Sequence, residues 1–306
     1  MRAFFLILAI DKIIMAIAAS IQNNQDPFSM PMPMGGQTEK AEPGEQAVST
    51  GQGDSAEAPA HSDSLVIIPT YNEKENIEQI IRYVFNLSQP FEILIIDDGS
   101  PDGTAGIVKN LMREFPHTLH IIERSGKLGL GTAYIAGFRW ALEHEYEYIF
   151  EMDADFSHNP DDLLHLRAAC AERGADLSIG SRYVTGVNVV NWPIGRVLMS
   201  YYASVYVRFI TGMKVHDATA GFVCYTRRLL SKMELDKIRF KGYAFQIEMK
   251  FTAAQMGARI EEVPIIFTNR VLGTSKMSGG IFSEAVFGVI KLKVGSWSRK
   301  YPKISE

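Results

Sequence analysis

From Ser64 onward the chain alternates between short apolar runs and stretches of helical character, which limits it to few architectures. Apolar runs bounded by polar residues, glycine or proline are typical of buried parallel strands, and the stretches between them are typical of connecting helices. The handedness rule then predicts right-handed βαβ units. We expect strands at about 65–69, 91–97, 119–123, 148–153 and 176–180, and helices at about 74–86, 104–115, 131–145 and 161–173.

After residue 180 the alternation becomes looser. We expect an aromatic-rich helix at 197–210, a strand at 220–225, a helix at 243–256 and a strand at 259–268. With 306 residues, of which 46% are hydrophobic and 22% charged, the chain can bury one large α/β core without a second enzymatic domain. Cys170 and Cys224 fall in apolar segments without metal-ligand spacing, so we expect reduced core residues.

Three predicted strands end in residues that suit a nucleotide site. These residues are Pro69, Tyr71, Glu73, Asp97, Asp98, Asp153 and Asp155. Ligands of open α/β sheets bind in the crevice outside the carboxyl ends of the strands, so we expect these residues to converge there. Asn72 is the predicted N-cap of the helix at 74–86.

Asp153 and Asp155 are separated by one residue at the end of the fourth predicted strand, where alternate side chains point the same way. Their oxygens suit a hard divalent cation, and the small number of protein ligands predicts Mg²⁺ or Mn²⁺ shared with substrate phosphates. Such a pair also occurs in helix caps and turns. A phosphatase with a nucleophilic aspartate needs the pair on an early strand and followed by Thr or Val, whereas Phe156 follows Asp155 here.

Motifs spread over residues 64–293 resemble those of the inverting family-2 glycosyltransferases and, within them, the dolichol-phosphate (polyprenol-phosphate) mannosyltransferases. The motifs are Pro-Thr-Tyr-Asn-Glu at 69–73, Asp-Asp-Gly-Ser-Pro-Asp-Gly-Thr at 97–104, Gly-Leu-Gly-Thr-Ala-Tyr at 129–134, Met-Asp-Ala-Asp at 152–155, Gly-Ser-Arg-Tyr at 180–183 and Gly-Thr-Ser-Lys at 273–276. The last two, with Arg196 and Arg270, are similar to the polyprenol-phosphate branch.

The resemblance implies a glycosyltransferase A-type (nucleotide-diphospho-sugar transferase) fold, with a mostly parallel sheet and helices on both faces. It also implies transfer of a mannosyl group from GDP-mannose to a dolichyl or polyprenyl monophosphate, with inversion at the anomeric carbon. The nearest alternative is the same chemistry with UDP-glucose or another nucleotide sugar. A non-catalytic sugar-binding or lipid-binding protein is a further alternative, although it would not need an intact metal pair.

The resemblance assigns roles to individual residues. The nucleoside pocket would be formed by Pro69, Tyr71, Glu73, Ile96, Asp98 and Ala154. The acceptor phosphate and the donor diphosphate would be bound by Arg182, Arg196, Arg270 and Lys276. Asp155 and Arg182 are the expected catalytic residues, and Asp153 and Asp155 the expected metal ligands. For Asp97 a turn or cap role is an equal alternative, and any single arginine could instead form a surface salt bridge.

The predicted acceptor removes the need for a general base. A lipid monophosphate with a second pKa near ~6 is largely dianionic at pH 7 and is itself the nucleophile. The site then needs positive charge to bring two anions together, and planar guanidinium groups are suited to phosphate.

Two further features lie between the motifs. The glycine-rich segment 126–131 has neither the Walker nor the dinucleotide-binding order, so we expect a turn into the next helix, with Lys127 as a candidate diphosphate contact. His158 has no second histidine at metal-ligand spacing, and we expect it in a loop beside the site.

Residues 1–63 differ from the rest of the chain. The apolar stretch 3–19, interrupted by Asp11 and Lys12, is interpreted as a peripheral membrane anchor, with a mis-assigned start codon or a signal segment as alternatives. The following segment is rich in Gln, Pro, Gly, Ser and Met and is expected to be a disordered linker. Residues 21–63 contain seven acidic residues and one basic residue, Lys40, so the negative net charge of −4 comes from this segment. The rest of the chain is close to neutral or slightly basic, and it shows no stripe of basic residues that would suit a nucleic acid.

The C-terminal residues 281–306 predict an amphipathic helix. Its apolar positions are 282, 286, 289, 290, 294 and 297, and Lys291, Lys293, Arg299 and Lys300 lie towards its end. This pattern fits either the membrane interface or core packing. We therefore expect an N-terminal segment and linker (1–63), a glycosyltransferase domain (64–280) and this helix. The expected location is peripheral, at the cytoplasmic face of a membrane, with the membrane surface and a small membrane protein as candidate partners.

Overall fold

The structure is a computed structural model that describes residues 61–242, 244–269 and 280–305, with the backbone alone for 280–286. Ser62–Glu306 forms one compact unit. The predicted N-terminal anchor and almost all of the predicted linker lie outside the described residues.

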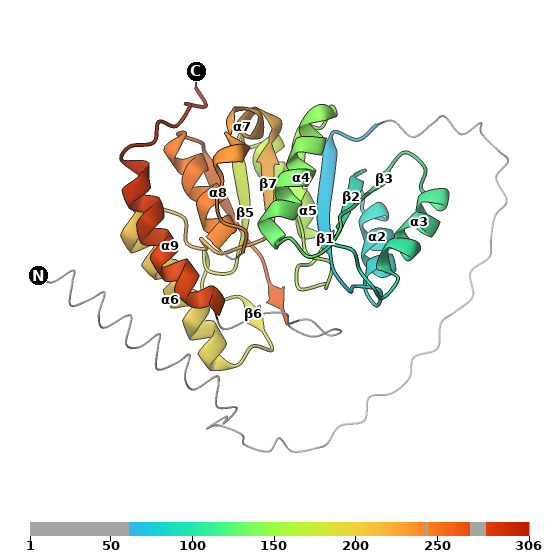
Figure 1. Ribbon diagram of the computed structural model, residues 1–306, viewed down its shortest axis with the longest axis horizontal. Coiled ribbons are helices and arrows are strands. Elements are labelled where there is room, and N and C mark those ends of the chain that lie inside the picture. Colours follow the sequence, from blue (N-terminus) through green and yellow to red (C-terminus); the bar gives the residue numbers. More distant parts are fainter. Residues whose placement is uncertain (1–60, 243, 270–279, 306) are drawn as a thin grey trace, which may run out of the picture. The chain divides into compact units, whose positions relative to one another are not determined.

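A seven-stranded sheet forms the centre of this unit, with strand order β3-β2-β1-β4-β7-β5-β8 (Figure 1). Its strands are β1 (Ser64–Thr70), β2 (Glu92–Asp97), β3 (Leu119–Glu123), β4 (Tyr148–Glu151), β5 (Leu177–Ser181), β7 (Val223–Thr226) and β8 (Ile260–Pro264). Only β7 runs antiparallel to its neighbours within this sheet. A small second sheet pairs β6 (Val189–Val190) with β9 (Phe267–Thr268) in parallel. The predicted mostly parallel sheet is confirmed.

Helices cover both faces of the central sheet, as predicted. One face packs against α4 (Leu130–Glu143), α7 (Arg227–Lys232) and α8 (Ala244–Gln255). The other packs against α2 (Ile77–Phe85), α3 (Thr104–Glu114) and α5 (Asp162–Ala171). Along β1, Leu65 and Ile67 belong to the first core cluster and Val66 and Ile68 to the second. Both faces of β1 are therefore buried, which explains its uninterrupted apolar sequence.

A third cluster joins three helices beyond the sheet. The helix α6 (Ile194–Thr211) packs against α9 (Gly280–Ser296) and α8, with Val207, Phe251, Val289 and Leu292 at the contact. A short 3-10 helix, η1 (Leu235–Lys237), precedes α8. The predicted domain boundary at residue 280 coincides with the start of α9, yet α9 packs within the same compact unit.

The structure corrects two local predictions at strand ends. The fourth strand ends at Glu151 rather than at residue 153, because its antiparallel neighbour β7 begins at Val223, directly opposite Glu151. Asp153 and Asp155 therefore lie in a loop, where strand alternation does not orient them. The predicted strand at 259–268 is divided into β8 and β9, which pair with different strands, β5 and β6.

A third correction concerns the first helix. The helix α2 begins at Ile77, so Asn72 is not its N-cap. The carbonyl oxygen of Glu73 accepts hydrogen bonds from the backbone N–H groups of Asn76 and Ile77, which forms a turn before the helix. Asn72 lies in the left-handed region, with φ of 57°. The residues after β1 thus form a loop at the carboxyl ends of the strands.

Candidate active site

The order of the strands determines where a ligand can bind. β1 lies between β2 and β4, so the chain reverses its direction of progress across the sheet at β1. The crevice outside the carboxyl ends of the strands at such a switch point is the usual ligand site of open α/β sheets. The residues following β1, β2 and β4 are those in which the sequence motifs fall.

Asp97 has a structural role at this edge. Its Oδ1 accepts hydrogen bonds from Thr70 Oγ1 at 2.9 Å and from Ser100 Oγ at 2.6 Å, and its Oδ2 accepts one from the backbone N–H of Ser100 at 2.9 Å. Asp97 is almost fully buried. Of the two roles expected for Asp97, the turn role agrees with these contacts.

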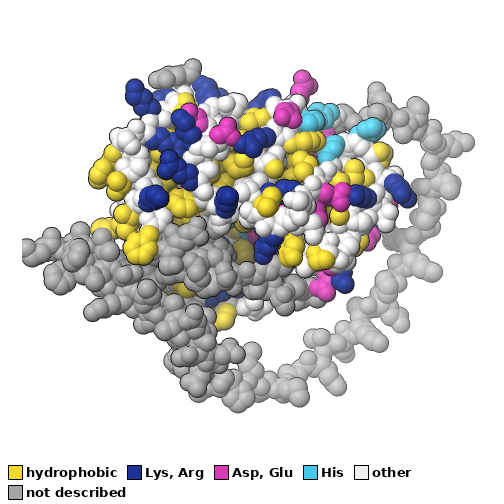
Figure 2. Space-filling model, in the orientation of Figure 1, with side chains coloured by type: hydrophobic (Ala, Val, Ile, Leu, Met, Phe, Trp, Pro, Cys, Tyr) yellow, Lys and Arg dark blue, Asp and Glu magenta, His cyan; other side chains and the backbone are white. Residues whose placement is uncertain are grey.

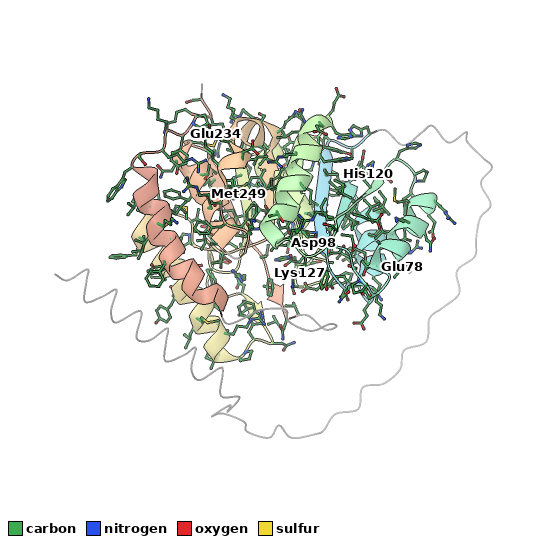
Figure 3. All side chains as sticks on the ribbon, in the orientation of Figure 1. Glu78, Asp98, His120, Lys127, Glu234 and Met249 are labelled. Carbon is green, nitrogen blue, oxygen red and sulfur yellow. The ribbon has the colours of Figure 1, made fainter. Side chains whose placement is uncertain are left out.

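Asp98 forms an ion pair with Arg124, a residue that the sequence analysis missed. Asp98 Oδ1 lies 2.6 Å from Arg124 Nε and 2.5 Å from Nη2, and Arg124 Nη1 donates to Thr132 Oγ1 at 2.8 Å. Arg124 directly follows β3, so its place after a third parallel strand was the available signal. Figure 3 shows Asp98 and Lys127 together near the carboxyl ends of the strands, whereas His120 lies further towards their amino ends.

The loop after β1 is joined to the loop after β2. The backbone N–H of Asn72 donates to Ser100 Oγ at 3.0 Å, and that of Glu73 donates to Thr104 Oγ1 at 3.1 Å. Lys127 Nζ lies 5.3 Å from the centre of the Tyr71 ring. The predicted Tyr71, Glu73 and Lys127 are thus brought to the same edge as Asp98.

The other three predicted nucleoside residues lie on or next to the same strands. Pro69 and Ile96 are register partners on β1 and β2. The Ile96 side chain is fully buried in the core cluster that includes α4, and Ala154 is buried in the cluster on the opposite face. Ile96 and Ala154 are therefore part of the core, whereas Pro69 is half-buried.

The glycine-rich segment is explained by packing. Gly129 has φ of +103°, which favours glycine, and Gly131 donates its backbone N–H to the carbonyl oxygen of Lys241 at 2.8 Å. A Cβ at Gly131 would lie 2.7 Å from the Phe245 ring and 2.9 Å from the carbonyl oxygen of Phe240. The glycines therefore allow the start of α4 to approach α8.

The predicted metal ligands occupy the loop after β4. Asp155 is buried and its Oδ1 accepts a hydrogen bond from the backbone N–H of Ser157 at 3.0 Å, while Asp153 is half-buried. Phe156, with φ of 57°, turns the chain between Asp155 and Ser157. In the described part of the chain no cluster of three or more His, Cys, Asp or Glu side chains could hold a metal. Two carboxylates with open positions fit an ion that is shared with substrate phosphates.

His158 follows in the same loop, as predicted. Its ring stacks on Phe222, with ring centres 4.8 Å apart, and meets the edge of Phe267 at 5.1 Å. Burial lowers the pKa of His158 to about 4, so its ring is neutral at physiological pH. The backbone N–H of Thr268 donates to the carbonyl oxygen of Ser157 at 3.1 Å. The carboxylate loop is thereby joined to β9.

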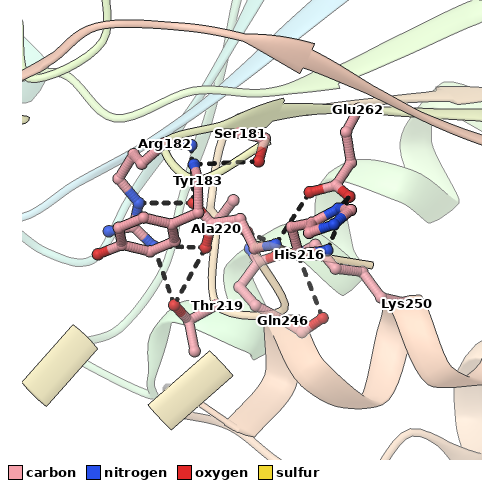
Figure 4. A network of polar contacts seen from close by, with 10 residues as sticks. Ser181, Arg182, Tyr183, His216, Thr219, Ala220, Gln246, Lys250 and Glu262 are labelled. Carbon is pink, nitrogen blue, oxygen red and sulfur yellow. Dashed lines mark hydrogen bonds and ion pairs between the residues drawn. The ribbon is translucent and has the colours of Figure 1, made fainter. Parts of the chain in front are cut away.

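Arg182 is held by a buried carboxylate. Asp217 accepts hydrogen bonds from the backbone N–H of Arg182 at 3.0 Å and from its Nε and Nη2, both at 2.7 Å. Nη2 also donates to Thr219 Oγ1 at 2.9 Å (Figure 4). Burial acts to raise the pKa of Asp217, but the charge and the hydrogen bonds of Arg182 outweigh it, so the pKa lies below its usual value. Asp217 is therefore ionised at neutral pH.

Arg182 and Arg196 meet at Trp192. The centre of the Trp192 ring lies 5.7 Å from the guanidinium carbon of Arg182 and 4.0 Å from that of Arg196. Arg196 Nη1 also donates to Asn269 Oδ1 at 3.0 Å, just beyond β9. Two of the four predicted phosphate ligands are thus adjacent, and they are close to the strand that contacts the carboxylate loop. Arg270 and Lys276 lie outside the described residues.

The family profile described as Glycosyl transferase family 2 matches residues 65–234, which include the loops described above. The chain belongs to this family. A polyprenol monophosphomannose synthase of Mycolicibacterium smegmatis is 45% identical over 83% of this chain and 94% of its own length. An undecaprenyl-phosphate mannosyltransferase of Micrococcus luteus is 47% identical over 74% of this chain and 92% of its own length.

Solved structures of glycosyltransferases share the fold of this family 2 enzyme. A mannosyltransferase from Pyrobaculum calidifontis, in complex with GDP-Man and Mn²⁺, superimposes with a TM-score of 0.51 at 19% identity, covering 81% of this chain and 68% of that one. A glucosyl-3-phosphoglycerate synthase from Mycobacterium tuberculosis gives 0.54 at 16% identity, covering 80% and 88%. The predicted glycosyltransferase A-type fold is confirmed.

Glu151 and Lys250 of this glycosyltransferase form a buried pair behind the site that was not predicted from the sequence. Burial raises the pKa of Glu151 to about 7, although Lys250 opposes the shift. Burial lowers the pKa of Lys250 to about 8, opposed by Glu151 and Asp217. The signal that could have revealed the pair was Lys250 itself, a charged residue among apolar ones in the sequence of α8. Cys170 and Cys224 are free, buried thiols, as predicted.

Proposed function

We propose that this glycosyltransferase transfers a mannosyl group from GDP-mannose to a polyprenyl (dolichyl-type) monophosphate, with inversion at the anomeric carbon. The observation that carries the proposal is the meeting of Arg182 and Arg196 at Trp192, beside the strand that contacts the carboxylate loop. Two guanidinium groups near two carboxylates are what a reaction between an anionic acceptor and a metal-bound diphosphate requires. The printed names of the 45% and 47% identical relatives support the same substrate class.

The donor would occupy the crevice at β1, β2 and β4. Tyr71 can stack on a base, and Asp98, kept in place by Arg124, can accept hydrogen bonds from a base or ribose. Asp153 and Asp155 would hold Mg²⁺ or Mn²⁺. When bound, the ion stabilises the negative charge that develops on the departing nucleoside diphosphate.

The acceptor would bind on the arginine side. Since a lipid monophosphate is already largely ionised at pH 7, no residue need remove a proton from it. Arg182 is kept in one orientation by Asp217, and Arg196 is partly exposed. We propose that these two arginines bind the acceptor phosphate, together with Arg270 and Lys276.

Peripheral membrane binding would bring the enzyme to this acceptor. One side of α9 is buried at Val289 and Leu292, while Phe287 and Val294 on this helix and Trp297 directly after it are 73%, 51% and 77% exposed. The neighbouring α6 also exposes apolar side chains, including Ile194 at 66%. Lys and Arg side chains lie among hydrophobic ones in this region (Figure 2). No described helix is both long and apolar enough to cross a bilayer.

We propose that the exposed side of α9, with α6, rests at the headgroup level on the cytoplasmic face, where GDP-mannose is available. Aromatic and basic side chains on one helix side are typical of interfacial helices. The predicted small membrane-protein partner stays a prediction.

A donor panel tests the proposed function. The full chain is incubated with Mg²⁺ or Mn²⁺, polyprenyl phosphate in detergent or vesicles, and radiolabelled GDP-mannose, UDP-glucose or UDP-N-acetylglucosamine in separate reactions. We expect labelled lipid from GDP-mannose, released by mild acid, and at most about a tenth as much from the other donors. Labelled lipid from a UDP-sugar alone would replace GDP-mannose as the donor. Donor binding without transfer to any lipid phosphate would overturn the assignment.

A further inference from the structure

The two sides of the proposed site are joined beneath its surface by buried polar side chains. Glu151, at the end of β4 and two residues before Asp153, accepts a hydrogen bond from Gln246 Nε2 on α8. One turn further along α8, Lys250 Nζ donates to Gln246 Oε1 at 3.1 Å. The same Nζ donates to the carbonyl oxygen of Ala220 at 2.6 Å. A continuous series of hydrogen bonds thus runs from β4 to residue 220.

Ala220 belongs to the loop that holds Arg182. Asp217, three residues earlier, provides the bidentate carboxylate for the guanidinium group. The loop is also attached to β8, because the carboxylate of Glu262 accepts a hydrogen bond from the backbone N–H of His216 at 2.7 Å (Figure 4). It accepts another from the backbone N–H of Asp217 at 2.9 Å. The loop that binds Arg182 is therefore attached both to β8, through Glu262, and to α8, through Lys250.

Burial and charge set this series apart from ordinary core packing. Glu151, Asp217 and Lys250 are 0% exposed, Gln246 is 4% and Arg182 is 8% exposed. Two acidic side chains, Glu151 and Asp217, are thus buried together with two basic ones, Arg182 and Lys250. Buried ion pairs give little net stability, and apolar side chains of similar volume often serve equally well or better. Stability alone therefore does not account for the arrangement.

We propose that Asp217, Gln246 and Lys250 are positioning residues, which hold Arg182 at a set distance and orientation from the loop that carries Asp153 and Asp155. The proposal rests on the proposed function, because it treats Arg182 as the acceptor-phosphate ligand. The attacking phosphate and the metal-bound diphosphate react only when they are aligned, and a displacement of about 1 Å can reduce the rate by about 100-fold. A rigid internal connection would provide that alignment.

Two substitutions cut the series at different places. Lys250→Met removes the bond to Ala220 with little change in volume, and Asp217→Asn weakens the hold on Arg182. We expect each to raise the KM for polyprenyl phosphate or lower kcat, with a combined loss of about 10- to 100-fold, and to change the KM for GDP-mannose less than about 3-fold. Because both act through one loop, the double variant should lose much less than the product of the two single losses.

Stability measurements separate positioning from folding. Lys250→Met should unfold earlier than the wild type, because removing one member of a buried charged pair leaves Glu151 without its cation and the carbonyl oxygen of Ala220 without its donor. Kinetics are therefore measured well below its transition, where a positioning effect persists and a folding effect does not. Lys250→Arg keeps a donor but overfills the core, so it should unfold earlier yet recover part of the activity. If Lys250→Met does not fold, Gln246→Met breaks the same series at its uncharged member.

Glu92→Gln is the matched control. Glu92 is a buried carboxylate at the first residue of β2, at the opposite end of the strands, and it accepts hydrogen bonds from Tyr146 Oη and the backbone N–H of Ser62. We expect this variant to unfold earlier with unchanged kcat and KM below its transition. Additive losses for Asp217 and Lys250, equal increases in both KM values, or losses that only follow the unfolded fraction would overturn the proposal. A wild type that transfers nothing to lipid phosphate would instead overturn the proposed function.

Discussion

At the scale of single residues, the acidic side chains at the carboxyl edge differ in role because their neighbours differ. Asp97 accepts three hydrogen bonds from Thr70 and Ser100, and Asp98 is paired with Arg124. Asp155 lies in a turn after the strand, with an N–H donor from Ser157. Asp97 therefore joins β1 to the loop after β2, whereas Asp155 lies in the loop that carries the predicted metal ligands. This contrast leads to the first prediction.

Asp155→Asn should reduce transfer by at least about 100-fold, because it removes an anionic metal ligand with almost no change in volume. Its melting temperature should stay within a few degrees of the wild type. Asp97→Asn, in contrast, should lower the free energy of unfolding by about 1–3 kcal/mol, because the amide cannot accept all the hydrogen bonds of the carboxylate. Transfer rates at saturating Mg²⁺ or Mn²⁺ and thermal unfolding check both, and normal turnover by Asp155→Asn would exclude the metal assignment.

Arg196→Lys should raise the KM for lipid phosphate by about 10-fold and that for GDP-mannose much less, because the ammonium group keeps the charge but loses the planar fork. Arg182→Lys should show the same selectivity with an additional loss of stability, since Asp217 loses its bidentate partner. Steady-state kinetics with each substrate varied in turn provide the measurement. Equal increases in both KM values would assign these arginines to the donor or to the fold.

The Arg182–Asp217 pair also predicts a pH dependence of stability. The pKa of Asp217 is lowered in the folded protein, so its ionised form stabilises the fold above the unfolded-state pKa of about 3.9, and the contribution is lost as the pH falls through the folded-state pKa. Asp217→Asn should therefore be less stable by about 3–5 kcal/mol at pH 7. The difference should shrink below about pH 4. Urea unfolding at several pH values tests this, and a difference that grows on acidification would contradict it.

At the scale of elements, α9 has two different sides. Val289 and Leu292 pack against α6 and α8, and beyond the helix Ile304 is buried, with its backbone N–H donating to the carbonyl oxygen of Met256. Phe287, on the other side of the helix, and Trp297, directly after its end, are exposed. The two roles considered for this helix, packing in the core and contact with a membrane interface, can therefore be served by its two sides. Removing residues 281–306 would damage both, so surface substitutions are the sharper test.

The double substitution Phe287→Ser and Trp297→Ser should weaken binding to vesicles containing anionic lipid by at least about 10-fold, because it removes the aromatic groups available to the interface. Activity on long-chain polyprenyl phosphate should fall, and activity on a short, water-soluble analogue should not. Val289→Ser, on the buried side, is the control and should lower the melting temperature and affect both acceptors alike. Vesicle binding that is unchanged by the double substitution would exclude α9 as the interfacial element.

At the scale of the whole molecule, the sheet order collects residues that are far apart in the sequence. The loops after β1, β2 and β4 supply Tyr71, Asp98 and Asp155, while the residue after β9 and the start of α6 supply Asn269 and Arg196. The antiparallel strand β7 separates β4 from β5, which ends at Ser181 next to Arg182. The proposed donor residues and Arg182 on the proposed acceptor side therefore follow strands of one continuous sheet, and ligand binding should be detectable as a change in global stability.

GDP should raise the melting temperature only when Mg²⁺ or Mn²⁺ is present. At about 100 times its Kd the nucleotide should add about 2.7 kcal/mol to the free energy of unfolding, because it binds the folded state alone. EDTA should abolish both the shift and transfer without lowering the melting temperature of the free protein. Differential scanning calorimetry with each combination measures this, and a full shift by GDP in EDTA would show that the metal does not join the nucleotide to the protein.

Sequence patterns predicted most of the strands and helices, the burial of both faces of the strands and the end of the sheet where we place the site, because hydrophobic periodicity and strand-end motifs are local properties. The tertiary contacts were needed to show that β7 is antiparallel, that β4 ends at Glu151, that Asp97 serves a turn, and that Arg124 and Asp217 are the partners of Asp98 and Arg182. Each of these depends on which distant segments meet. Hydrophobic patterning places a side chain in the core or at the surface, but it carries no information about which residue will lie opposite.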